Sequence, residues 1–255
     1  MRILREVDSM NQRSSQLHDA ARQGDADELA LILQDGRGVD LRDATGRTAA
    51  ILAAVEGHAD CLELLISAGC DIDAKDPLGC TAAMLAAGQG SSDCLRLLIS
   101  ARCDLRAASL EMTAFRIAAI KGHVQCLALL LAAGCELEAR DSNGRTAAHL
   151  SAANGQGGCL SLLIEAGCEL DEPDIFGRTP ANAAACGGHA DCLALLIAAG
   201  CDLDVPDMNG RTAAVWARLQ GHGGCIAVIE AAADRRMLAA SLQGTSFAEK
   251  PPKRL

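Results

Sequence analysis

Four histidines stand three residues before a cysteine, and this pairing is the first pattern in the chain that could do chemistry. The pairs are His58/Cys61, His123/Cys126, His189/Cys192 and His222/Cys225. Imidazole nitrogen and thiolate sulfur are both zinc ligands, but a closed structural zinc site needs four of them. Each pair supplies two, and the nearest matching pair lies 33 residues or more along the chain. The pattern leaves two interpretations, a metal- or redox-active thiol site and a core cysteine that acts as a small hydrophobe.

The acidic residues offer a second possible site, because several of them stand two positions apart. The pairs are Asp71/Asp73, Glu136/Glu138, Glu169/Asp171 and Asp202/Asp204. On an extended segment, both members of such a pair point to one side. They could bind a cation or a basic partner, or they could form a solvated acidic edge.

Catalysis has no residue set to perform it. The sequence contains no nucleophile–base–acid combination, phosphate loop or dinucleotide-binding fingerprint. Cys80 and Cys186 are the cysteines predicted to react most readily, since both should lie near the surface, but neither has an evident catalytic partner. We therefore expect a protein that is not an enzyme and needs no cofactor.

The remaining cysteines reveal how the chain is organised, because they recur at a fixed interval. One series is Cys61, Cys94, Cys126, Cys159, Cys192 and Cys225, and a second is Cys70, Cys103, Cys135, Cys168 and Cys201. The steps are 33 residues, with one of 32 in each series. A period in the range of roughly 20–50 residues indicates stacked copies of one small unit. Equivalent positions on packed helices lie about 8–10 Å apart, whereas a disulfide needs Cα atoms within about 7 Å. Reduced thiols, and hence a cytoplasmic or nuclear location, are expected.

Charge and hydropathy exclude two classes of partner. The formal net charge is −10, which disfavours a broad nucleic-acid footprint and an anionic membrane surface. No stretch has the apolar length of a membrane span, and residues 1–9 lack the apolar run of a signal peptide. Half of the residues are hydrophobic, yet only 2% are aromatic, so alanine and leucine must do the packing, as suits closely packed helices.

The repeat from 43 to 75 shows the elements that must position all these residues. It opens with the turn Asp-Ala-Thr-Gly. Thr48 is the predicted N-cap of a first helix over 49–56, which Gly57 ends. A second helix begins at His58 or Asp60 and runs to about residue 68. A short extended segment over 71–73 then leads into the next turn.

This unit resembles the ankyrin repeat. The resemblance rests on tandem copies of Gly-x-Thr-Ala or its near variants, and on Gly-His at four of the second-helix starts. It covers a degenerate first unit, 15–42, and six further units at 43–75, 76–107, 108–140, 141–173, 174–206 and 207–236. The implied fold is an all-α solenoid of about seven helix-turn-helix units joined by short β-hairpin turns. Residues 1–14 are then an N-terminal extension, and 237–255 the end of a last helix followed by a disordered tail.

The chain departs from the family pattern in two ways. The Thr-Pro-Leu-His of the family is Thr-Ala-Ala-x in most units, with only Thr179-Pro180 keeping the proline and only His149 the histidine. The unit boundary between Ala107 and Thr113 is also one residue short, and Glu111 stands in place of the turn glycine. We expect this hairpin to be shorter or differently shaped, which could mark the centre of a partner site or mere drift.

In the ankyrin family, ligands usually meet the hairpin tips and the first helices. This resemblance implies a non-catalytic module that binds a partner protein, as a scaffold or adaptor does. Arginine and large apolar side chains are typical interface anchors, and an arginine stripe would favour an acidic segment of a partner. A monomer is expected. The alternative is a thiol-based metal-binding or redox-sensing protein. The expected partner-binding residues are Arg47, Leu78, Met112, Ile120, Lys121, Asn143, Arg145, Phe176, Arg178, Asn209 and Arg211.

Overall fold

The fold is known from a computed structural model that describes residues 2–34 and 38–244. The tail predicted over 245–255 lies outside the described residues. Contacts divide the chain into two compact units, residues 1–142 and 143–255. Each unit is a stack of helix pairs, as predicted.

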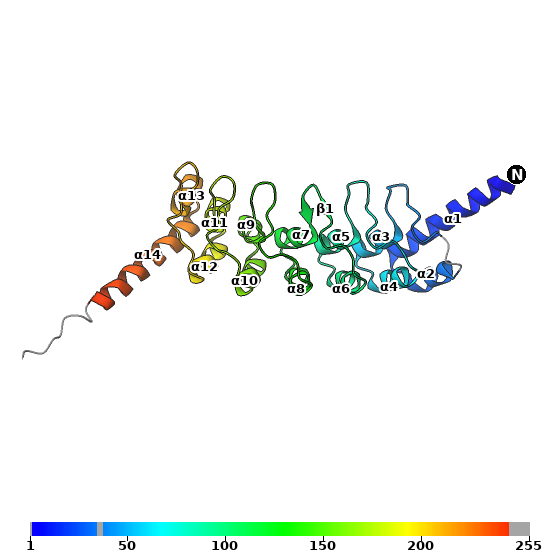
Figure 1. The fold of residues 1–255 in the computed structure, drawn as a ribbon, viewed down its shortest axis with the longest axis horizontal. Coiled ribbons are helices and arrows are strands. Elements are labelled where there is room, and N and C mark those ends of the chain that lie inside the picture. The colour runs from blue at the N-terminus through cyan, green and yellow to red at the C-terminus, as the bar shows by residue number, and fades with distance from the viewer. Residues whose placement is uncertain (1, 35–37, 245–255) are drawn as a thin grey trace, which may run out of the picture. The chain divides into compact units, whose positions relative to one another are not determined.

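The first unit contains four antiparallel helix pairs (Figure 1). They are α1 (Arg2–Gln23) with α2 (Ala26–Leu33), α3 (Ala49–Glu56) with α4 (Ala59–Ser67), α5 (Ala82–Gln89) with α6 (Ser92–Ser100), and α7 (Ala114–Lys121) with α8 (Val124–Ala132). The first helices of the pairs pack against one another in sequence order, and so do the second helices. The unit therefore has two helical layers, from one of which the hairpin loops project.

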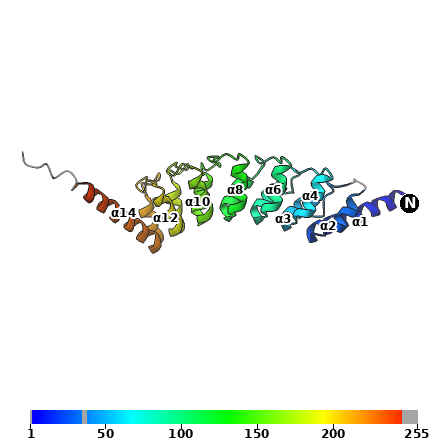
Figure 2. The ribbon, with the colours of Figure 1, turned by 90° about the horizontal axis from the view of Figure 1, so that it is seen from below.

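The second unit repeats this arrangement with three pairs (Figures 1 and 2). They are α9 (Ala147–Ala153) with α10 (Gly157–Glu165), α11 (Pro180–Gly187) with α12 (Ala190–Ala198), and α13 (Ala213–Gln220) with α14 (Gly223–Gly244). The first helices α9, α11 and α13 pack in order, as do α10, α12 and α14. Helix α14 runs past the last repeat.

Helix ends follow the chemistry expected from the sequence. Thr48 has extended backbone angles and its hydroxyl accepts a hydrogen bond from the N–H of Ile51, which confirms the predicted N-cap. Gly57 ends the same helix with φ +81°, a left-handed conformation that glycine adopts without steric cost. The second helix begins at Ala59, directly after His58, within the predicted range.

The core of each unit consists of leucine, alanine and cysteine. All six cysteines of the first series are essentially inaccessible, together with leucines such as Leu95 and Leu193 that follow two of them. This confirms that the cysteine period marks core positions. Among the described residues, the only β-ladder is the hairpin of β1 (Ala108–Ser109) and β2 (Met112–Thr113), which lies at the shortened boundary.

The first and last helices, α1 and α14, are longer than the other helices of their units. Helix α1 begins at Arg2, so it includes residues 2–14 of the predicted N-terminal extension. At the other end, α14 reaches Gly244. The repeat boundaries given above stay predictions.

Candidate protein-binding surface

An aspartate at the base of each regular hairpin fixes the shape of its tip. One carboxylate oxygen of Asp174 accepts hydrogen bonds from the N–H groups of Phe176 and Arg178, both at 2.8 Å. Asp207 binds the next tip in the same way, and the indole N–H of Trp216 donates to its other oxygen. Burial raises the pKa of Asp207, but these hydrogen bonds outweigh it and leave the pKa below its ordinary value. The tips are therefore rigid platforms.

Neighbouring tips in the second unit are joined backbone to backbone. The N–H of Ile175 donates to the carbonyl of Asn143 at 3.0 Å, and the N–H of Met208 donates to that of Phe176 at 2.9 Å. Gly177 makes this contact possible, because a Cβ built there would lie 2.9 Å from the nitrogen of Met208. Side chains on successive tips consequently stand beside one another.

Large apolar side chains are exposed on these tips. In the second unit, Ile175 is 50%, Phe176 47% and Met208 77% exposed. In the first unit, Leu78 is 71% exposed. Leu78 and Phe176 are among the residues predicted from the sequence, whereas Ile175 and Met208 are not. Their position directly after the turn aspartate, which leaves them outside the core, is the signal that could have found them.

The predicted arginines are held by the hairpins themselves. Arg178 pairs with Asp174, Nη2 to Oδ2 at 2.9 Å, and its guanidinium carbon lies 5.0 Å from the ring centre of Phe176. Arg211 stacks in the same manner over Trp216, and Arg47 lies 3.8 Å from Asp76. These arginines are ordered, and their charge is partly balanced within the stack.

The other predicted binding residues are distributed over tips and first helices. Lys121 and Asn209 are exposed, whereas Met112, Ile120, Asn143 and Arg145 are half-buried. Phe176 and Arg178 share one tip, and Asn209 and Arg211 share the next. Ile120 and Lys121 lie at the end of α7 rather than on a tip.

The four histidines of the His-x-x-Cys pairs join neighbouring repeats. The Nε2–H groups of His58 and His123 donate to the carbonyls of Arg22 and Gly88 in the preceding repeat, at 3.1 and 3.0 Å. His189 and His222 form the equivalent bonds at 3.0 and 3.1 Å. Each imidazole therefore satisfies a carbonyl near the end of a helix, where no intrahelical donor is available.

The cysteines have the properties of packed core residues. Burial, followed by nearby aspartates, raises the pKa of Cys70 and Cys103 to about 12, and burial raises that of Cys192 to about 11. Such thiols are protonated at neutral pH and react slowly. No cluster of three or more His, Cys, Asp or Glu side chains that could hold a metal occurs in the described part of the chain. The arrangement thus gives no support to a thiol sensor. Cys80 and Cys186 are half-buried.

The acidic pairs form hydrogen bonds between repeats. The N–H of Asp71 donates to Asp40, that of Asp104 to Asp73, and that of Asp202 to Asp171, at 2.8–2.9 Å. Each of these carboxylates thus stabilises the loop of the following repeat. These aspartates therefore have a structural role in the stack.

The shortened boundary has the unusual backbone that the sequence predicted. Leu110 and Glu111 form the two-residue turn between β1 and β2, with φ +46° and +65°. Leu110 is 92% exposed. Behind the turn, the buried Arg116 donates to the carbonyl of Glu111, and the Glu111 carboxylate accepts the N–H of Ser142. These bonds hold a conformation that non-glycine residues adopt only at a cost.

Comparison with known proteins agrees with this geometry. A family model described as ankyrin repeats (3 copies) matches residues 17–109, 102–174 and 157–234. The ankyrin repeat domain of human ASB11 has a similar structure, with a TM-score of 0.77, 21% identity, and coverage of 93% of this chain and 99% of that chain. The ankyrin repeat domain of Bcl-3, a member of the IkappaB family, aligns with a TM-score of 0.72 and 26% identity over 84% of this chain and 97% of its own.

No curated protein was found to be significantly similar in sequence. None of the helices in the described residues is long and apolar enough to cross a membrane. Ankyrin repeat domains are a general protein–protein interaction fold. With the family match spanning nearly all of both units and the repeat chemistry present in each, the chain belongs to the ankyrin repeat family.

Proposed function

We propose that the protein binds a partner protein, without catalysis, through its hairpin tips and first helices. The observation that carries the proposal is the apolar strip Ile175, Phe176 and Met208 on two adjoining tips of the second unit. Large apolar groups on a rigid, ordered surface lose little entropy on binding and are typical interface anchors.

Charge gives the proposed partner a chemical character. Arg178 and Arg211 border the apolar strip, and each is fixed by stacking on an aromatic ring. A guanidinium that is already ordered loses less conformational entropy when it binds a carboxylate through two parallel hydrogen bonds. An amphipathic segment with acidic residues beside its apolar ones would complement this surface.

The proposed contact residues comprise the tips and the ends of the first helices in both units. They are Arg47, Leu78, Met112, Ile120, Lys121, Asn143, Arg145, Ile175, Phe176, Arg178, Met208, Asn209 and Arg211. The proposal includes a monomeric scaffold or adaptor in the cytoplasm or nucleus.

The double variant Phe176→Ala/Met208→Ala tests the proposal. Arg178 is left intact because its loss would leave the buried Asp174 without its ion pair. The immobilised variant should capture fewer of the proteins that the wild type retains from an extract of the native host, by about tenfold or more, at an unchanged melting temperature.

A matched control removes exposed apolar groups elsewhere. Leu31 on α2 and Val124 on α8 are exposed and lie on the second-helix layer. The variant Leu31→Ala/Val124→Ala should capture the same proteins as the wild type. Equal capture by the tip variant and the wild type would remove the tips from the binding surface.

A further inference from the structure

One junction between repeats in the first unit lacks a hydrogen bond that its neighbours have. Where the junction is regular, an aspartate of one repeat accepts the loop N–H of the residue 31 positions later, as Asp40 does for Asp71 and Asp73 for Asp104. The position after Asp73 in this series is occupied by Arg106. Because the intervening unit is one residue short, the corresponding residue of the following repeat is Glu136, 30 positions later, and both residues line one groove. Arginine has no acceptor atom. The link cannot form.

The two groups at this junction are left unpaired in the structure. Neither the N–H of Glu136 nor the guanidinium of Arg106 has a hydrogen-bond or ion-pair partner among the described residues. The backbone of Arg106 is itself regular, since its N–H donates to Asp104 at 2.9 Å as in the other repeats. Only the acceptor is missing, and it has been replaced by a cation.

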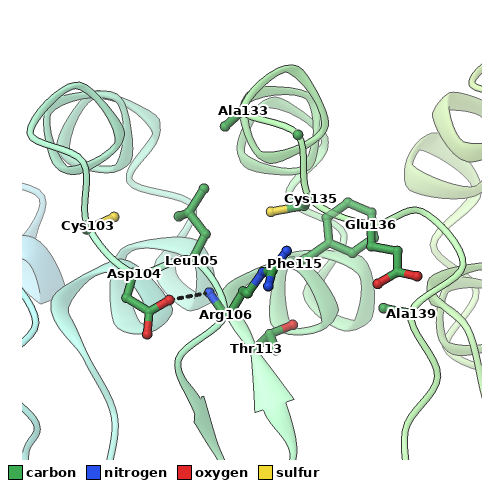
Figure 3. Close-up of a pocket in the computed structure, with 11 residues that line it drawn as sticks. Cys103, Asp104, Leu105, Arg106, Thr113, Phe115, Ala133, Cys135, Glu136 and Ala139 are labelled. Atoms are coloured by element: carbon green, nitrogen blue, oxygen red, sulfur yellow. Dashed lines mark hydrogen bonds between the residues drawn. The ribbon is translucent and has the colours of Figure 1, made fainter.

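An open groove lies at this place (Figure 3). Its volume is about 600 Å³, and its lining includes Leu105, Arg106, Phe115, Cys135 and Glu136. The loops after α6 and α8 form its walls, and Phe115 of α7, which is only 4% exposed, lies at its floor between them. In Figure 3 the side chain of Arg106 runs toward Phe115, while the carboxylate of Glu136 points to the opposite side.

We propose that this groove binds a carboxylate side chain of a partner polypeptide, which takes the place of the missing aspartate. The carboxylate would accept the N–H of Glu136, as Asp73 accepts that of Asp104, and would pair with Arg106. An apolar residue next to it in the partner would cover Leu105, which is half-buried. None of the groove residues belongs to the tip surface proposed above, so this inference does not depend on that function.

Charge at the groove is compatible with an anion. Asp104 and Glu136 also line the groove, and their carboxylates repel a third carboxylate electrostatically. The regular junctions tolerate the same crowding, because Asp73 binds the N–H of Asp104 with Asp71 two residues away. At the groove the arginine adds a positive charge that no regular junction has, and charge-assisted hydrogen bonds are about twice as strong as neutral ones.

The chain itself supplies a suitable probe. The peptide acetyl-Asp-Ile-Asp-amide copies residues 71–73, the segment that provides the acceptor in a regular junction. Titrated into the nitrogen-15-labelled full chain, it should shift the amide resonance of Glu136. The matched peptide acetyl-Asn-Ile-Asn-amide should bind about tenfold more weakly, since an amide gives only neutral hydrogen bonds. Sodium acetate that binds as tightly as the aspartate peptide would overturn the assignment to a polypeptide.

Two substitutions separate the roles of the arginine and the missing acceptor. Arg106→Ala should lower the affinity for the aspartate peptide by about tenfold, because the ion pair is lost. Arg106→Asp should restore the internal link, abolish the peptide-induced shift at Glu136 and raise the melting temperature by about 2–4 °C. The control Arg96→Ala removes an exposed arginine of α6 that pairs with Asp93 and should leave binding unchanged. Unaltered peptide binding in both Arg106 variants would overturn the proposal.

Discussion

Residues of the same type have different roles in this chain, and the surroundings of each residue determine its role. A cysteine in the first-series position, such as Cys94, is fully buried and functions as a small apolar group. Cys80 occupies a tip position that holds arginine in other repeats and is half-buried. The thiol count alone therefore says little about chemistry, because ten of the thirteen cysteines are buried.

Aspartates at the hairpin bases should make stability depend on pH, and Asp207 provides the test. At neutral pH, Asp207→Asn should lower the free energy of unfolding by about 1.5–3 kcal/mol, since the amide cannot accept all three N–H groups that the carboxylate binds. The folded pKa of Asp207 lies below the unfolded value near 3.8, so this stabilisation is present above that value and is lost as the pH falls through the folded pKa.

Urea unfolding of both proteins at pH 7, 5 and 3 checks this expectation. The difference between wild type and variant should be the same at pH 7 and 5 and should shrink at pH 3. Asp204→Asn, at an exposed position, serves as control and should change stability by less than about 0.5 kcal/mol. A difference for Asp207 that does not vary with pH would show that its ionised form has no special role.

At the scale of the element, the hairpin at residues 108–113 shows how a sequence irregularity becomes structure. Removal of one residue converts the regular turn into a two-residue turn in which Leu110 and Glu111 both have positive φ. Asparagine tolerates this conformation much better than leucine. The variant Leu110→Asn should therefore raise the free energy of unfolding by about 1 kcal/mol, measured by urea denaturation.

Leu78 provides a matched control for this variant. It is also an exposed leucine on a hairpin tip, but its turn has positive φ only at Gly79. Leu78→Asn should thus leave stability within about 0.5 kcal/mol of the wild type. Equal effects of the two substitutions would mean that surface polarity, and not backbone strain, determines the result.

Elements also show what the sequence could and could not predict. Helix ends were predictable because Thr48 and Gly57 have local, specific chemistry. The bonds of His58 and Asp73 to other repeats were not, because their partners lie 36 and 31 residues away and no periodic signal names an acceptor. Arg106 stands in the sequence where other repeats have an acidic residue. The consequence of this substitution could be understood only once the structure showed the hydrogen bond that Asp73 forms at the equivalent position.

At the scale of the whole molecule, the chain consists of repeats, and within each of the two units every repeat contacts its neighbours. The stacked-repeat fold could be read from the period, and the family from the Gly-x-Thr-Ala and Gly-His motifs, whereas the candidate binding residues depend on exposure. Phe176 was identifiable from its tip position, and Met208 could have been found from its place directly after the turn aspartate Asp207, which leaves it outside the core. In such a stack, the residues that repeat maintain the fold and those that differ are available for recognition.

Local contacts predict local loss of protection when the core is damaged. Leu127 in α8 is fully buried, and Leu127→Ala should cost about 2–5 kcal/mol. In the first unit, α8 packs on α7 and α6, and α6 in turn on α4. Hydrogen exchange should accelerate most in α7 and α8, less in α5 and α6, and little in α1 and α2, because stability in a repeat stack is a sum of nearest-neighbour terms. The control Val124→Ala, at an exposed position of the same helix, should leave the exchange pattern unchanged. An equal loss of protection in every helix of residues 1–142 would instead identify that unit as a single cooperative block.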